Sequence, residues 1–232
     1  MTNNPQIIVG GAWNDISATE SILNNDNIKL DIISAEESES YLMAFEMIQQ
    51  HSDDADEFVK VDTDNLKCIK ISCADNTLNA CIELMASCSE ILKGGGEITL
   101  LPLSMNMLTK NQWLEIMDEE GDEIDKAIDV FTDIVADEDN EELLISAGMQ
   151  SFGLKDYFID GFDDFEDTAA NLDSICRFVV GEGVDIEVQE SISVGEDNES
   201  VYMATEPSAE IEKEDGINNQ YGYIELMKIT DE

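Results

Sequence analysis

Residues 67–103 read KCIKISCADNTLNACIELMASCSEILKGGGEITLLPL, and the hydrophobic pattern changes twice along this stretch. At its start, Ile69, Ile71 and Cys73 alternate with Cys68, Lys70 and Ser72, which predicts a strand with one more apolar face. At its end, residues 97–103 form a short apolar run that predicts a second strand. The segment between these two strands has a different period.

Apolar side chains in that segment recur at steps of three and four residues, which is the pattern of an amphipathic helix. This stripe consists of Leu78, Cys81, Ile82, Met85, Cys88 and Leu92. Asp75 or Asn76 is the predicted cap at its start. Gly94–Gly96 ends it, as glycine commonly does after a helix. The stretch therefore predicts a strand, a helix and a strand in succession.

The remaining chain continues this mixture of short strands and helices. Apolar runs predict strands at residues 6–9, 28–33, 58–61, 143–147, 184–188, 201–204 and 221–229. Helical spacing predicts helices at residues 14–23, 40–50, 109–117, 122–136 and 168–180. Thr109 and Gln112 have the spacing of a capping box, and Thr168 is the cap candidate for the last helix.

The order of these elements is irregular and does not repeat a strand–helix–strand unit. It favours an α+β fold, with one or more mixed or largely antiparallel sheets packed with about four to five amphipathic helices. A boundary near residue 140 gives two α+β halves, residues 1–140 and 141–232. A single continuous domain explains the same pattern equally well.

The charge of the chain is extreme, with 11 Lys and Arg against 54 Asp and Glu and a net charge of −43. Residues 1–116 carry 19 acidic and 6 basic side chains, whereas residues 117–232 carry 35 and 5. Such a surface repels phosphates and anionic membranes, so direct binding of nucleic acid is not expected. A basic protein, a cation or a high-salt environment fits better.

The cysteines, the first residues and the lengths of the apolar runs indicate the cellular compartment. The five cysteines are odd in number and form no Cys-x-x-Cys pair, and His51 is the single histidine, which argues against a zinc site or a disulfide framework. The first residues lack the basic and apolar regions of a signal peptide, and no run approaches the length of a membrane span. We expect a cytoplasmic, reduced protein.

Residues 148–167, GMQSFGLKDYFIDGFDDFED, combine aromatic, glycine and acidic residues. Phe152, Tyr157 (or Phe158) and Phe162 are expected to face a core, with turns at Gly153 and Gly161 and the acids in solvent.

Part of this stretch resembles an uncharacterised, mainly bacterial family, the domain-of-unknown-function family 4261. The matching positions are Gly148, Phe152, Gly153 and Asp156, followed by the helix that ends in RFVVGEGVDI at residues 177–186 and then by residues 190–192. Gln189 stands where that family has glycine. The family has no established activity, so the resemblance implies a type of fold and no reaction.

The motifs that carry chemistry in other proteins are incomplete in this sequence. The acidic runs at residues 118–125, 137–142 and 160–167 lack the glycine at the sixth position of a calcium loop. Residues 9–15, VGGAWND, lack the lysine of a phosphate loop. The cysteines on helix stripes are typical of core packing. The sequence therefore predicts no catalytic residue, no metal site and no cofactor, so an enzyme is the less favoured interpretation.

Two acidic clusters remain as candidate binding residues. They are Asp118, Glu119, Glu120, Asp122 and Glu123, and Asp160, Asp163, Asp164, Glu166 and Asp167. One hypothesis is a non-enzymatic protein whose acidic face binds a basic protein partner, as an inhibitor, an immunity protein or an anti-defence protein does, with mimicry of DNA as one form. The alternative is a domain of the unknown-function family, housekeeping or enzymatic, whose acidity reflects adaptation to salt. The oligomeric state and the partner are not specified by the sequence.

Overall fold

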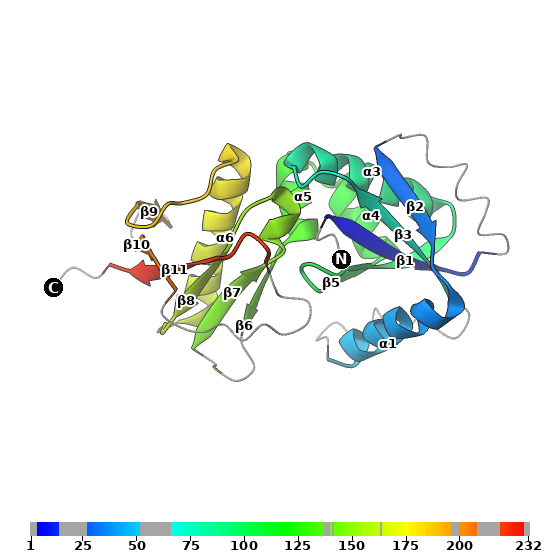
Figure 1. The fold of residues 1–232 in the computed structure, drawn as a ribbon, viewed down its shortest axis with the longest axis horizontal. Helices are drawn as coiled ribbons and strands as arrows, with labels where there is room; N and C mark the ends of the chain where they lie inside the picture. Colours follow the sequence, from blue (N-terminus) through cyan, green and yellow to red (C-terminus); the bar gives the residue numbers. More distant parts are fainter. Residues whose placement is uncertain are drawn as a thin grey trace.

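The two strands of residues 67–103 belong to the first of two sheets, on either side of its central strand, and the helix between them covers one face of that sheet. The computed structural model describes residues 4–13, 27–51, 66–136, 140, 142–162, 164–195, 200–207 and 219–229, with side chains for all of these except residues 48–51. Figure 1 shows the two sheets at opposite ends of the long axis of the molecule, with a short helix, α5, between them.

The first sheet has five strands in the order β2-β3-β1-β4-β5, and every neighbouring pair is antiparallel. The strands are β1 (Gln6–Gly11), β2 (Ile28–Ile32), β3 (Lys67–Cys73), β4 (Gly96–Leu101) and β5 (Asn106–Thr109). Helices on both faces cover this sheet. They are α1 (Ala35–His51) on one face, and α3 (Leu78–Lys93) with α4 (Lys110–Asp118) on the other.

The alternation of side chains along these strands divides them between two apolar layers. Ile7 and Val9 of β1 and Ile69 of β3 pack under α3, whereas Ile8 and Cys68 pack under α1 with Phe45. Successive side chains of a strand point to opposite faces, so a sheet covered on both sides needs apolar residues at consecutive positions.

The second sheet has six strands in the order β6-β7-β8-β11-β10-β9. The strands are β6 (Asp133–Ala136), β7 (Leu143–Ala147), β8 (Asp156–Asp160), β9 (Ser191–Val194), β10 (Ser200–Thr205) and β11 (Tyr223–Lys228). All pairs are antiparallel except β8 with β11, which is parallel. Helix α6 (Phe165–Glu182) packs against this sheet, so the fold is α+β with one antiparallel and one mixed sheet, as the sequence predicts.

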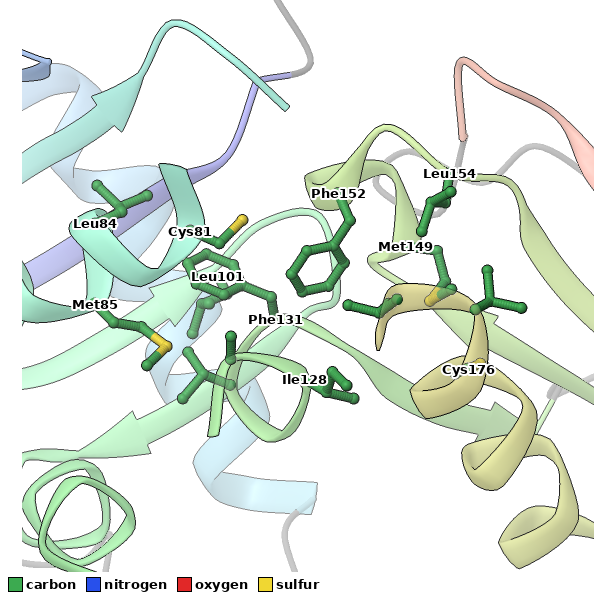
Figure 2. Packing of buried hydrophobic residues seen from close by; sticks show 14 of the residues in the cluster. Cys81, Leu84, Met85, Leu101, Ile128, Phe131, Met149, Phe152, Leu154 and Cys176 are labelled. Atoms are coloured by element: carbon green, nitrogen blue, oxygen red, sulfur yellow. The ribbon is translucent and has the colours of Figure 1, made fainter. Parts of the chain in front are cut away.

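Two short helices lie where the two sheets meet. They are α5 (Glu123–Phe131) and the 3₁₀ turn η3 (Met149–Phe152), and α5 packs against both α3 and α6. The largest hydrophobic cluster contains residues of both halves, and Figure 2 shows Cys81 and Met85 of α3 near Phe131, with Phe152 beyond them. The hydrophobic core is therefore continuous across the predicted boundary near residue 140. The division into two domains stays a prediction.

Several predicted boundaries differ from the structure. Helix α3 is capped by Thr77, whose side chain accepts a hydrogen bond from the amide of Ala80, rather than by Asp75 or Asn76. Asn76 instead donates to the carbonyl of Gln150 at 2.7 Å, which a local sequence pattern does not reveal. Helix α1 begins at Ala35, earlier than the predicted residue 40.

The other differences fall in the second half. The predicted helix 122–136 ends at Phe131, because the apolar residues at 134 and 135 belong to β6 and pair with β7. Helix α6 begins at Phe165 after the cap Asp164, so Thr168 is not the cap. Residues 184–188 form no strand, and Ser191–Val194 do. The predicted helix 14–23 and strand 58–61 lie outside the described residues.

The capping box at Thr109 is confirmed. The Thr109 side chain accepts from the amide of Gln112, and the Gln112 side chain accepts from the amide of Thr109. This cap sets the start of α4 and directs Trp113 into the core, where its indole N–H donates to Ser89 of α3 at 2.9 Å. Trp113 is fully buried, so Ser89 is the acceptor that satisfies this group.

This contact makes a prediction about two neighbouring serines of α3. Ser89→Ala should lower the free energy of unfolding by about 1–3 kcal/mol, because the buried indole N–H of Trp113 then has no acceptor. Ser87→Ala is the matched control, since Ser87 is also buried and donates to the carbonyl four residues earlier, with no indole bound to it. Denaturant unfolding measures both. Equal effects of the two substitutions would mean that the indole bond contributes nothing.

Candidate functional site

The first acidic cluster lies in the turn between α4 and α5, and its five side chains are all exposed. Asp122 is the N-cap of α5 and accepts a hydrogen bond from the amide of Ile124 at 3.0 Å. Lys126 bends back over the turn, and its Nζ donates to the carbonyls of Met117 and Glu119 at 2.8 and 2.6 Å. The end of α4 and the start of α5 are thereby both capped, which holds the acidic turn in one conformation.

The second acidic cluster surrounds the start of α6. Asp164 is the N-cap and accepts from the amide of Asp167 at 2.9 Å. Glu166 and Asp167 occupy the first turn, where a negative charge interacts favourably with the helix dipole. Asp160 ends β8, and all four of these side chains are exposed. Asp163, the fifth residue predicted for this cluster, lies outside the described residues.

Arg177 is the single arginine of the chain, and it joins α6 to α5. Its Nε donates to Asp173 on its own helix at 2.7 Å. Its two terminal nitrogens pair with Asp125, at 3.5 Å, and with Asp129 of α5. A planar guanidinium can bind several carboxylates at once, which a lysine does less well. The one arginine therefore offsets repulsion where three aspartates of two helices converge.

The two clusters lie at opposite ends of the α5–α6 pair. Asp125 of α5 meets Arg177 of α6, whereas residues 132–134, just after α5, line a shallow hollow with Ala169 and Ala170. The helices are therefore antiparallel. Twelve residues separate positions 165 and 177, about 18 Å along a helix, so the clusters are separated by about that distance or more.

Further aspartates lie between the two clusters. They are Asp125, Asp129, Asp133 and Asp173, three of which line the same hollow. We call the set that runs from the first cluster, through these four residues, to the second cluster the acidic band. The sequence predicted its two ends but not the residues that connect them.

The four motif positions of residues 148–156 converge on the joint between the halves. Gly148 has a φ of +99°, and a Cβ there would lie 2.0 Å from the carbonyl oxygen of Phe131. Gly153 has a φ of +78°, and a Cβ there would lie 2.9 Å from the carbonyl oxygen of Asn76. Only glycine permits both the conformation and the approach of the other half. The ring of Phe152 packs edge-to-face on Phe131, with centroids 6.1 Å apart (Figure 2).

Asp156, the fourth motif position, is a buried carboxylate with three donors. Its Oδ1 accepts from the amide of Met149 at 3.1 Å and from the hydroxyl of Ser146 at 3.3 Å, and its Oδ2 accepts from the side-chain amide of Asn219 at 2.8 Å. Ser146 itself accepts from the amide of Tyr157, so its proton is free for Asp156. The carboxylate thus ties β7, η3 and the residues before β11 together.

Burial of Asp156 raises the pKa of its carboxyl to about 7, although the bonds from Asn219, Met149 and Ser146 favour the charged form. Asp156 is only 1 % exposed, so no substrate reaches it. Cys176 lies close by, and burial raises the pKa of its thiol well above the usual value. A buried thiol of this kind is not a nucleophile. The arrangement is a structural network, with no exposed reactive group.

The remaining chemical candidates are spread through the core. All five cysteines are free and buried, and burial raises the pKa of Cys81 and Cys88 as well. No group of three or more His, Cys, Asp or Glu side chains is placed to hold a metal ion within the described part of the chain. Gly10 and Gly11, from the glycine-containing stretch at residues 9–15, belong to strand β1.

No helix among the described residues is long and apolar enough to span a membrane.

Sequence reasoning missed a hollow of about 620 Å³ at the other edge of the second sheet. One side consists of Glu190 and the edge strand β9, and the other consists of Phe178, Val184, Asp185 and Ile186. The only local signal is Phe178 in RFVV, an aromatic residue next to the buried stripe of α6 but not on it. Its side chain is 51 % exposed.

No family model matches this chain, and neither the curated proteins nor the solved structures that were searched contain a match. The resemblance of residues 148–156 to the unknown-function family therefore stays a prediction.

The Asp156 network predicts how stability depends on pH. The pKa of the carboxyl is about 3.9 in an unfolded chain and about 7 in the folded protein, so the folded state binds the proton more tightly. The stabilisation is present below about pH 4 and is lost as the pH rises through 7. Between pH 4.5 and 8, the free energy of unfolding should fall by about 2–4 kcal/mol more in the wild type than in Asp156→Asn.

Comparing the wild type with a variant at each pH removes the shared effect of the other acids. Asp160→Asn is the matched control, because Asp160 lies at the exposed end of the same strand, and it should follow the wild type. Denaturant unfolding at several pH values gives the free energies. A difference between wild type and Asp156→Asn that stays constant with pH would contradict the titration of this buried carboxyl.

Proposed function

We propose that this protein is non-enzymatic and binds a basic protein partner through the acidic band. The observation that carries the proposal is the continuity of exposed aspartates and glutamates over the turn between α4 and α5, along the antiparallel α5 and α6, and around the start of α6. A long band of one sign creates a strong local potential, which attracts and orients a partner of the opposite sign.

The distribution of the positive side chains supports the proposal. Lys29, Lys93 and Lys155 pair with acids of this chain, and Lys67 and Lys126 donate to its own carbonyls. Such contacts use these cations to support the fold, and Arg177 offsets three aspartates in the middle of the band. Among the described residues, the acidic side chains of the two clusters at its ends have no salt bridge to a cation. An inhibitor, an immunity protein or an anti-defence protein would use a surface of this kind, and mimicry of DNA is one form that an elongated band allows.

One observation favours the alternative of adaptation to salt. Glu36, Glu37 and Glu39 are exposed on α1, which covers the far face of the first sheet and lies away from the band. Acids that serve only solubility are expected over the whole surface. Under this alternative the chain is a domain of another function, and its charge reflects its surroundings. The five free cysteines fit a reducing compartment, and we include a cytoplasmic location in the proposal.

The proposal is tested by capture of partners from native lysate with the tagged protein, at low and high salt. We expect one basic protein to be enriched at low salt and lost at high salt, because screening weakens contacts between exposed charges. Excess duplex DNA should release that protein if the band imitates DNA. An eluate that is empty or indiscriminate at low salt would contradict the proposal.

Neutralisation of the first cluster locates the contact. The variant carries Asp118→Asn, Glu119→Gln, Glu120→Gln, Asp122→Asn and Glu123→Gln, and asparagine at position 122 keeps the cap of α5. The matched control neutralises five exposed acids elsewhere, namely Glu36, Glu37, Glu39, Asp75 and Glu90. We expect the first variant to weaken binding about tenfold or more and the control to change it little. Equal losses would favour an unspecific effect of net charge.

A further inference from the structure

The outer edge of strand β9 is the feature that carries an additional inference. β9 is the last strand of the second sheet, and it pairs on one side with β10. No described strand pairs with its other side. An exposed edge offers unpaired N–H and C=O groups to any extended chain that reaches it. Edge strands of this kind bind peptides by the addition of one strand to the sheet.

The hollow beside β9 has the shape and lining for such an addition. Glu190 and all four residues of β9 form one wall, so the hollow follows the whole strand. Phe178 and Val184 stand on the opposite wall and are 51 % and 55 % exposed. About half of each side chain therefore remains in water, and contact with an apolar side chain of a ligand would bury it.

The opposite wall is already ordered before anything binds. The carboxylate of Asp185 accepts from the amide of Lys155 at 3.1 Å and from the hydroxyl of Tyr157 at 3.2 Å. That hydroxyl in turn accepts from the amide of Ile186 at 3.1 Å. These bonds fix residues 184–186 against β8, so a ligand would not have to order this wall.

The charge near the hollow favours one class of ligand over another. Asp185 and Glu190 line it, and the exposed Glu182 and Glu187 lie within two residues of its lining residues in the sequence. The nearby cations are engaged, since Lys155 pairs with Asp185 at 3.9 Å and Arg177 with three aspartates. A second copy of this chain would bring two surfaces of high negative charge together, which repulsion opposes. A segment rich in lysine or arginine is favoured instead.

The other edge of the same sheet lacks these properties. Beside β6, the hollow is lined by Asp129, Asp133 and Asp173 and by the small side chains of Ala169 and Ala170. It offers charge without an exposed aromatic anchor. Of the two edges of this sheet, the one at β9 therefore combines a free strand edge with an exposed aromatic side chain and nearby acids.

We propose that the hollow between β9 and Phe178 binds an extended, basic segment of a partner protein, which adds as a strand to β9 and places an apolar side chain against Phe178 and Val184. This inference rests on the proposed function and names a contact that the acidic band does not include. The band would attract the partner through charge, whereas β9 would hold one segment of it by backbone hydrogen bonds and apolar contact.

The test uses a defined probe and the full-length protein. The probe is a short fluorescent peptide in which lysine alternates with valine and phenylalanine, so that one face of its strand is basic and the other is apolar. A second peptide has the same sequence with N-methyl groups on alternate residues, which removes the amide donors of one edge and leaves the charge unchanged. Binding is measured by fluorescence anisotropy at low and moderate salt.

Two matched substitutions on α6 locate the contact. Phe178→Ser should weaken binding of the unmethylated peptide about tenfold or more, because the apolar anchor is removed. Phe165→Ser is the control, since Phe165 is 50 % exposed on the same helix but lies beside the second acidic cluster. It should change binding less than about twofold. Circular dichroism of both variants checks that they are folded.

Each other outcome overturns the β9 proposal in a recognisable way. Equal binding of the methylated and unmethylated peptides would show attraction by charge alone, and the proposed function would survive without the β9 contact. The β9 contact is also rejected if both phenylalanine variants bind the peptide like the wild type, or if both lose affinity equally. No binding of the peptide at low salt also rejects the β9 contact, and capture from lysate then decides the proposed function by itself.

Self-association is checked by sedimentation of the wild type and Phe178→Ser. Both should be monomeric if the edge is kept for a different partner. A wild-type dimer that Phe178→Ser dissociates would make a second copy of this chain the occupant and would overturn the proposal.

Discussion

The two halves of the chain approach each other closely at η3, and this contact positions α5 and α6. Gly148 and Gly153 allow the backbone to lie against Phe131 and Asn76, which belong to the other half. Asp156 fixes the same turn from within through its three donors. The approach places α5 between the sheets, and α5 brings its aspartates beside α6. The acidic band therefore exists because of a buried joint that contains none of its residues.

Repulsion among the acidic side chains destabilises this fold, because the net charge is −43. Several acids act against that repulsion locally, since Asp122 and Asp164 cap helices and Glu166 and Asp167 lie at the positive end of a helix dipole. Arg177 offsets the repulsion among three aspartates of α5 and α6. The exposed acids are thus partly supported by the fold that carries them. Their number still exceeds what these structural roles require, which is why recognition of a basic partner is the favoured explanation.

The helices and strands were predicted best where the pattern is local and strong. The helix α3 and the capping box at Thr109 follow from spacing over a few residues, and both are found. Of the predicted stripe of α3, Cys81, Met85, Cys88 and Leu92 are buried, whereas Leu78 and Ile82 are only partly buried and the buried Leu84 and Ile91 were not predicted. The errors occur where a distant contact decides. Residues 133–136 have helical spacing but pair with β7, and Asn76 donates to Gln150 rather than capping α3. Sequence spacing carries no information about either partner, because each lies on a separate element.

The fold class, the excess of negative charge and the two ends of the acidic band could be read from the sequence, and reduced cysteines were expected from it. These properties depend on composition and on periods of two or about four residues, which are local. Only the tertiary structure decided that the two clusters are joined along α5 and α6, that Asp156 is buried and that Phe178 faces a hollow beside β9. Those properties depend on which elements meet across the core, and burial and close approach arise only when distant parts of the chain pack together.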